Sequence, residues 1–182
     1  MAITHGQTWD GVQNLVGWWL SEKMDGMRAY WDGLKLLSRH GKEFKVPAWF
    51  FEGFPRFSMD GELWMGRGTF DQLASLLNSV DLNEDQWRQL GYYVFDLPRS
   101  THTYEERMEQ LRTFKEIFPS HIHIVESVKC SDREHLNNYL ELIIEQGGEG
   151  LMARQPGSCY TPGLVFSLLK VKVPNILRLV IM

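Results

Sequence analysis

The first third of the chain alternates short apolar runs with polar turns, a pattern typical of β-strands. Residues 16–20 form one such run, and residues 29–31 and 34–37 flank the pair Asp32-Gly33. Asp-Gly between two apolar runs predicts a β-hairpin with a type I′ turn, because both central residues of that turn need positive φ. The polar segment between the first run and the hairpin carries Lys23. We therefore expect this lysine at the end of a strand, beside a rigid sheet.

Apolar residues recur at helical spacing in three later segments, each preceded by residues that commonly begin helices. The expected helices begin at Thr69, at Thr103 and at residues 131–132, and Gly147 is placed to end the third. A strand bearing Glu149 is expected to follow. The positions expected to be buried are Phe70, Leu73, Leu76 and Leu77 in the first helix, Met108, Leu111 and Phe114 in the second, and Leu136, Leu140 and Ile143 or Ile144 in the third.

The composition is that of a globular domain. With 182 residues and 43% hydrophobic content, the chain can bury one sizeable core, and we expect a single domain over residues 1–182. It has no apolar run of about 18 residues, and its start lacks a basic segment followed by an apolar one, so neither a transmembrane segment nor a signal peptide is expected. We expect a monomer without membrane association, and the sequence leaves its localisation unknown.

The charge balance limits how the chain can bind nucleic acid. A net charge of −4 argues against binding by the whole surface, because duplex affinity comes mostly from Lys and Arg contacts to phosphates. Any DNA would have to meet a local basic face. The alternative is that such residues are simply solvated. The candidates for this face cluster in the first third of the chain and are Arg39, Lys42, Lys45, Arg56 and Arg67.

The segment Lys23-Met24-Asp25-Gly26-Met27-Arg28 carries the clearest candidate chemistry. A lysine amine is a poor nucleophile at its usual pKa of about 10.4, but neighbouring cations, desolvation or metal coordination of the leaving group can change that. Taken alone, Lys-x-Asp-Gly-x-Arg is only moderately specific, and a surface cluster beside a turn is the alternative. Motifs elsewhere in the chain are needed to distinguish a reactive lysine from a surface cluster.

Further motifs follow in order. They are Ser38-Arg39-His40-Gly41, Met59-Asp60-Gly61-Glu62-Leu63-Trp64, and the segments 92–98, 147–152 and 168–172. The ordered series resembles the covalent nucleotidyltransferase family of ATP-dependent DNA ligases, RNA ligases and mRNA capping enzymes. The text around Lys23 and Glu62 is similar to that of the small bacterial ATP-dependent DNA ligases. The resemblance covers nearly the whole chain, from Trp18 to Lys172.

The resemblance implies an α+β nucleotidyltransferase (adenylation domain) fold, in which antiparallel sheets pack with helices and the nucleotide lies between the sheets. It implies ATP and Mg²⁺ (or Mn²⁺) as cofactors and nicked double-stranded DNA as the partner. It also implies an enzyme that forms lysyl-AMP and transfers the AMP to a DNA 5′-phosphate. The implied site residues are the nucleophile Lys23, the nucleotide-binding residues Glu22, Arg28, Glu62, Phe95, Lys170 and Lys172, the nucleic-acid phosphate ligand Arg39, and the metal ligands Glu62 and Glu149.

Several of these assignments have a structural alternative. Phe95 lies in a short apolar run that would otherwise indicate a core residue. Glu62 and Glu149 could be solvated carboxylates, although each lies in an apolar, glycine-flanked run where an idle charge is costly. Lys170 and Lys172 alternate and so share one face of a strand, but alternating lysines also protect edge strands from aggregation.

The sequence departs from the family pattern in two places. Ten residues follow Lys172, too few for the OB-fold domain with which ligases normally continue, so no OB-fold domain is expected. The apolar tail at 174–182 is expected to pack on the body or on a partner. Leu164 stands where the small ligases usually carry an arginine, which removes one phosphate or nucleotide contact. Two other functions stay open: a module that holds nucleotide or nicked DNA without turnover, and an RNA ligase or capping-type enzyme.

Overall fold

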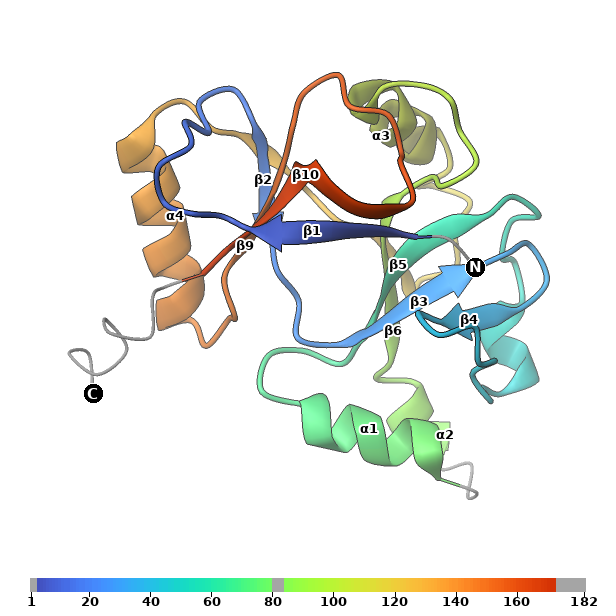
Figure 1. The fold of residues 1–182 in the computed structure, drawn as a ribbon. Helices are drawn as coiled ribbons and strands as arrows, with labels where there is room; N and C mark the ends of the chain where they lie inside the picture. Colours follow the sequence, from blue (N-terminus) through green and yellow to red (C-terminus); the bar gives the residue numbers. More distant parts are fainter. Residues whose placement is uncertain (1–2, 80–83, 173–182) are drawn as a thin grey trace.

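Two five-stranded β-sheets form the centre of the protein, and helices flank them (Figure 1). The computed structural model describes residues 3–79 and 84–172. Sheets packed with helices are the architecture expected from the sequence. The tail at 174–182, for which packing was expected, lies outside the described residues.

The first sheet takes its strands from both ends of the chain, in the order β1-β10-β9-β2-β8. Its strands are β1 (Thr4–Thr8), β2 (Trp19–Glu22), β8 (Val128–Lys129), β9 (Leu151–Arg154) and β10 (Gly163–Val171). The apolar run at 16–20 enters the sheet only at Trp19, because a turn occupies residues 16–17, where Gly17 has a φ of +85°. The strand that delivers Lys23 is therefore shorter and later than the apolar run predicts.

The second sheet comes from one continuous part of the chain and has the order β4-β3-β5-β6-β7. Its strands are β3 (Met27–Trp31), β4 (Leu36–Ser38), β5 (Met59–Trp64), β6 (Gly91–Asp96) and β7 (Ile122–Ile124). β7 runs parallel to β6, as β1 runs parallel to β10. The prediction of antiparallel sheets is wrong for these two edge pairs, which long crossovers connect.

The hairpin predicted around Asp32-Gly33 forms between β3 and β4, but its turn is not type I′. Within residues 32–35 only Gly33 has a positive φ, +104°. The Asp32 side chain instead accepts hydrogen bonds from the backbone N–H groups of Leu34 and Lys35, each at 2.8 Å. An aspartate that binds its own backbone in this way closes a longer loop than the two-residue turn.

All three predicted helices are present, as α1, α3 and α4. The helices are η1 (Ala48–Phe51, a 3-10 helix), α1 (Phe70–Asn78), α2 (Glu84–Trp87), α3 (Tyr104–Thr113) and α4 (Arg133–Glu145). Thr103 and Glu106 form a capping box at the start of α3, and the Asp132 side chain caps α4. The hydroxyl of Thr69 donates to Gly66 O at 2.7 Å, so α1 lacks the capping box that its sequence suggests.

The helices bury their apolar faces against the sheets in two cores. Leu73 of α1 and Met108 of α3 belong to the core of the second sheet, whereas Leu136 of α4 packs with Leu20 in the core of the first. Phe70 is 39% exposed, so its predicted place in the core is wrong. Among the described residues, no helix combines the length and apolar character needed to cross a membrane.

Candidate active site

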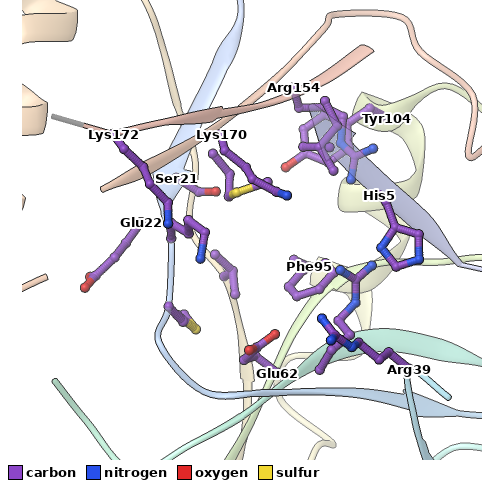
Figure 2. Close-up of a pocket in the computed structure, with 17 residues that line it drawn as sticks. His5, Ser21, Glu22, Arg39, Glu62, Phe95, Tyr104, Arg154, Lys170 and Lys172 are labelled. Carbon is purple, nitrogen blue, oxygen red and sulfur yellow. The ribbon is translucent and has the colours of Figure 1, made fainter. Parts of the chain in front are cut away.

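A pocket of about 310 Å³ lies among residues from both sheets (Figure 2). This volume falls at the lower end of the range of small-molecule sites in proteins. The first sheet presents lysines to the pocket, and Glu62 enters it from the second sheet. Almost all site residues expected from the sequence line the pocket, namely Glu22, Lys23, Arg28, Arg39, Glu62, Phe95, Lys170 and Lys172.

Glu149 joins this group through its contacts with two of the lysines. One carboxylate oxygen of Glu149 accepts a hydrogen bond from Lys23 Nζ and the other from Lys172 Nζ. The side chains of Lys23 and Glu149 are 20% and 22% exposed, and that of Lys172 is 44% exposed. A single carboxylate therefore holds two ammonium groups at the edge of the pocket.

The loop before β9 fixes both Glu149 and the backbone of Lys23. Glu149 lies in this loop and not on the strand, contrary to the expectation from the sequence. The next residue, Gly150, has a φ of +147°, and a Cβ there would lie 2.4 Å from Val171 O, so only glycine fits. Gly150 O in turn accepts a hydrogen bond from Lys23 N–H at 2.8 Å. The loop thus ties the residue after β2 to the end of β10.

The two carboxyl groups of the site have opposite pKa shifts. Burial raises the pKa of Glu149, but hydrogen bonds from Lys172 and Lys23 outweigh it, and the net pKa lies below its usual value. Burial also raises the pKa of Glu62, to about 7, although the positive charges of Arg28 and Lys23 oppose the rise. Glu149 is therefore a firmly ionised carboxylate, whereas Glu62 titrates near neutral pH.

Arg28 is held in the pocket wall by a buried carboxylate. Its Nε and Nη2 atoms each lie 2.6 Å from an oxygen of Asp60, which is fully buried, and Tyr160 donates to the same carboxylate at 2.5 Å. Nη2 of Arg28 also donates to Thr4 O at 3.2 Å, which joins β3 to β1 across the two sheets. Planar, bidentate pairs of this kind fix an arginine more firmly than a single contact does.

Phe95 faces the pocket and is not a core residue. It is partly exposed, lines the pocket and lies outside both apolar cores, so the core alternative is wrong. The Arg28 guanidinium lies 4.6 Å from the centre of its ring. An aromatic ring that is exposed in a pocket offers a flat surface on which a nucleotide base can stack.

Glu22 differs from the other predicted nucleotide ligands. Its two carboxylate oxygens accept hydrogen bonds from Arg67 Nε and Nη2 at 2.7 and 2.8 Å. Figure 2 shows the side chain directed away from the centre of the pocket. Its hydrogen-bonding capacity toward a ligand is therefore largely used within the protein.

The predicted basic face is only partly assembled at the pocket. Arg39 lines the pocket and is exposed, so its charge is available at the rim. Lys42, Lys45 and Arg56 are exposed but do not line it. Arg67 is engaged with Glu22, as described above.

Arg154 is the clearest pocket residue that the sequence reasoning missed. Its Nη2 atom forms an ion pair with Asp96 at 3.0 Å, and its guanidinium lies 5.3 Å from the ring of Tyr104, which also lines the pocket. Nη1 is buried without a hydrogen-bond partner among the described residues. The alternation of side chains along β9 could have indicated this residue, because Met152 and Arg154 lie on the same face of the strand, opposite to buried Leu151.

Known proteins match this chain in sequence and in structure. The model of the family described as ATP dependent DNA ligase domain matches residues 10–172. A DNA ligase from Haemophilus influenzae is 35% identical over 161 residues, which cover 88% of this chain and 59% of that protein. The chain thus spans less than two thirds of this relative.

Solved structures give the same result. A structure from the analysis of Lig E DNA ligases, on DNA binding with a minimal scaffold, superposes with a TM-score of 0.88 at 32% identity, covering 95% of this chain and 69% of that one. Chlorella virus DNA ligase-adenylate superposes with a TM-score of 0.77 at 22% identity, covering 94% and 67%, which shows a shared fold. With the family match over most of its length, the chain belongs to the family of ATP-dependent DNA ligase domains.

Proposed function

We propose that this chain is the core of an ATP-dependent DNA ligase that carries AMP on Lys23. The observation that supports this best is the grouping of Lys23, Lys170 and Lys172 in one pocket with Phe95 and Glu62. Glu149 contacts two of these lysines at the edge of the pocket. Such a set can bind a base at one end and a polyphosphate at the other. Family membership supports the same reaction.

In the first step, the lone pair of Lys23 Nζ forms a bond to the α-phosphorus of ATP. The bond from that phosphorus to the pyrophosphate oxygen breaks. The nitrogen gives up one proton before it attacks, which frees its lone pair, and a second one afterwards, so the phosphoramidate keeps one N–H. Lys23 Nζ forms a hydrogen-bonded ion pair with Glu149, and this ion pair must open before the amine can attack. Lys170 and Lys172 place positive charge where the phosphate oxygens gain negative charge, which lowers the barrier.

In the later steps, an oxygen of a DNA 5′-phosphate attacks the same phosphorus, and the bond to Lys23 Nζ breaks. A 3′-hydroxyl then attacks the activated 5′-phosphate and releases AMP, which closes a nick in double-stranded DNA. Arg39, exposed at the rim of the pocket, would contact a phosphate of the nucleic acid. The acting unit would be a monomer with residues 1–182 as a single domain.

The carboxyl groups of the pocket suit a divalent cation. Glu62 is partly buried at the pocket and has no ion pair within residues 3–79 and 84–172, and a cation would offset the cost of its charge. In that part of the chain, no three or more His, Cys, Asp or Glu side chains are grouped so that they could hold a metal ion by themselves. Mg²⁺ fits this set because it commonly binds one or two carboxylates plus substrate phosphates, and Mn²⁺ accepts similar oxygen ligands. Held by Glu62 and Glu149, it would neutralise charge on the phosphates.

The base end of the pocket has its own polar group. The adenine would stack on the face of Phe95 that Arg28 does not cover. The buried Nη1 donor of Arg154 has no hydrogen-bond partner within the described ranges 3–79 and 84–172, which supports a ligand with an acceptor atom at that point.

The intact mass of the purified full chain before and after incubation with ATP and Mg²⁺ tests this proposal. A gain of one AMP in the wild type, absent in Lys23→Ala, is the expected result. Lys35→Ala is the matched control, because Lys35 is exposed, pairs with Glu43 and does not line the pocket. Charging of Lys23→Ala to the wild-type level would refute the assignment. Nicked DNA and nicked RNA, compared side by side, then separate a DNA ligase from an RNA ligase.

One observation favours a second function, that of a module which holds nucleotide or nicked DNA without turnover. Leu164, where the small ligases usually carry an arginine, is 67% exposed on β10 and supplies no charge. ATP binding without any gain of mass would support this alternative. Multiple-turnover sealing by the isolated chain would exclude it.

A further inference from the structure

One arginine joins three separate parts of the chain beside the proposed nucleophile. Arg67 lies between β5 and α1, yet its Nε and Nη2 atoms reach Glu22, the last residue of β2, at 2.7 and 2.8 Å. Its Nη1 atom donates to Gln146 Oε1 at 2.9 Å, at the carboxyl end of α4. The loop that leaves the second sheet is therefore fastened to a strand and a helix of the first.

The contact is built for a guanidinium and a carboxylate. Two parallel N–H donors meet two oxygens, a geometry that lysine cannot reproduce. The side chains of Glu22 and Arg67 are 17% and 29% exposed, so the pair is partly shielded from water. A Cβ at Gly148 would lie 3.1 Å from Glu22 Oε1 and 2.5 Å from Ile143 Cγ2, so a glycine there keeps space for the carboxylate.

The position of Glu22 links this contact to the chemistry. Lys23 is the next residue, and its backbone N–H is held on one side by Gly150 O at 2.8 Å. Arg67 holds the preceding side chain from the other sheet. The direction in which Lys23 leaves β2 is thus fixed from both sheets.

We propose that Arg67 is a positioning residue for Lys23, acting through Glu22. The pair sets the direction of the lysine into the pocket and the separation of the two sheets around it. Glu22, which the sequence suggested as a nucleotide ligand, would then act within the protein. The inference rests on the proposed function of Lys23 as the residue that receives AMP.

Single-turnover charging of the full chain, followed by intact mass over a range of ATP concentrations, separates positioning from binding. For Arg67→Ala, we expect the maximal rate to fall about 10- to 100-fold, since a displacement of about 1 Å at a reacting atom has effects of this size. The ATP concentration for half-maximal rate should change by less than about threefold, because a uniform loss of binding is not involved. Arg67→Lys should restore only part of the maximal rate. The exchanged pair Glu22→Arg/Arg67→Glu should have a higher maximal rate than Glu22→Arg alone or Arg67→Glu alone. Arg88→Ala is the control, because Arg88 forms an exposed pair with Glu84.

Two results would overturn the inference. One is an unchanged maximal rate with a higher ATP concentration for half-maximal rate, which would make Glu22 or Arg67 a nucleotide contact. The other is wild-type behaviour in both quantities. Thermal unfolding of each variant shows whether it folds, and Arg67→Lys keeps the test available if Arg67→Ala does not.

A second measurement does not depend on charging. Peptide mapping after brief acetylation compares the modification rate of Lys23 with that of exposed Lys35 in the same molecule. If Arg67 positions Lys23, the ratio should change at least about threefold in Arg67→Ala and stay constant in Arg88→Ala, the exposed pair serving as the reference. An unchanged ratio overturns the inference, whether or not the wild type accepts AMP. Failure of the wild type to gain AMP, by contrast, refutes only the proposed function.

Discussion

The buried cluster around Asp96 makes a quantitative prediction about stability. Asp96, at the end of β6, is fully buried and accepts hydrogen bonds from Arg107 Nε at 2.5 Å and from Arg107 Nη2 at 3.1 Å. It also forms an ion pair with Arg154 Nη2 at 3.0 Å. The Arg107 side chain is also fully buried. In Asp96→Ala this guanidinium would keep its charge in the interior and lose its counter-ion.

The size of the effect follows from these contacts. Breaking a buried ion pair by removing one partner costs about 3–5 kcal/mol of unfolding free energy. Arg107 Nη1 keeps two carbonyl acceptors, His102 O at 2.7 Å and Ser158 O at 2.9 Å, so we expect the lower part of that range, about 3–4 kcal/mol. For a domain of this size, this corresponds to a fall in Tm of about 6–16 °C.

Urea unfolding followed by near-ultraviolet circular dichroism measures this change. The control is Glu43→Ala, because Glu43 and Lys35 are 52% and 57% exposed, and we expect a loss below about 1 kcal/mol there. The double variant Asp96→Ala/Arg107→Met should regain part of the loss, since it removes the unpaired charge. A loss below about 1 kcal/mol for Asp96→Ala with an unchanged m-value would refute the reasoning.

Three further predictions concern other parts of the structure. Phe95→Ala should weaken ATP binding by about tenfold in calorimetry, because base stacking on an aromatic ring contributes about 1–3 kcal/mol; equal affinity would argue against stacking. Gly61→Ala should lower the free energy of unfolding by about 1–3 kcal/mol in urea, since its Cβ would lie 2.5 Å from Tyr93 O. A wild-type midpoint would contradict that contact. Asp132→Ala should lower the Tm at pH 7, where the ionised side chain caps α4. A hydrogen bond from His135 N–H lowers the pKa of Asp132, so its contribution is present above the unfolded pKa of about 3.9 and is lost as the pH falls through the folded value. The Tm difference should therefore shrink toward pH 2, and a difference independent of pH would count against the cap.

Local patterns in the sequence were sufficient for much of the fold, and the motifs that carry the family resemblance indicated most of the residues that line the pocket. The capping box at Thr103 and the alternation of Lys170 and Lys172 depend on neighbours within a few residues, so they can be read from the chain. The type of turn at Asp32 could not be predicted, because an Asp-Gly pair fits more than one turn. Here the hydrogen bonds that the Asp32 side chain accepts from the backbone determine the loop. The missing cap of α1 could not be predicted for the same reason, because the Thr69 hydroxyl donates to Gly66 O and does not cap the helix.

Contacts between distant residues could not be predicted in this way. Glu22 and Arg67 are 45 residues apart, and Tyr160 and Asp60 are 100 apart. Their pairing depends on the order of the strands in each sheet and on how the sheets face each other. No local pattern encodes that arrangement, so the contact between Glu22 and Arg67 could not be predicted from the sequence.

The strand order has a consequence for synthesis on the ribosome. The second sheet uses only residues 27–124, so its five strands can pair once that stretch has emerged. The first sheet needs β2 from the early chain and both β9 and β10 from its late part. Domains of newly made chains fold in the order in which their contacts become available, and distant pairings form slowly. Lys23 is synthesised early, but it reaches its final position only after Gly150 and β10 have joined the sheet. The nascent chain would therefore carry a folded half and an unassembled nucleophile until nearly the last described strand is made.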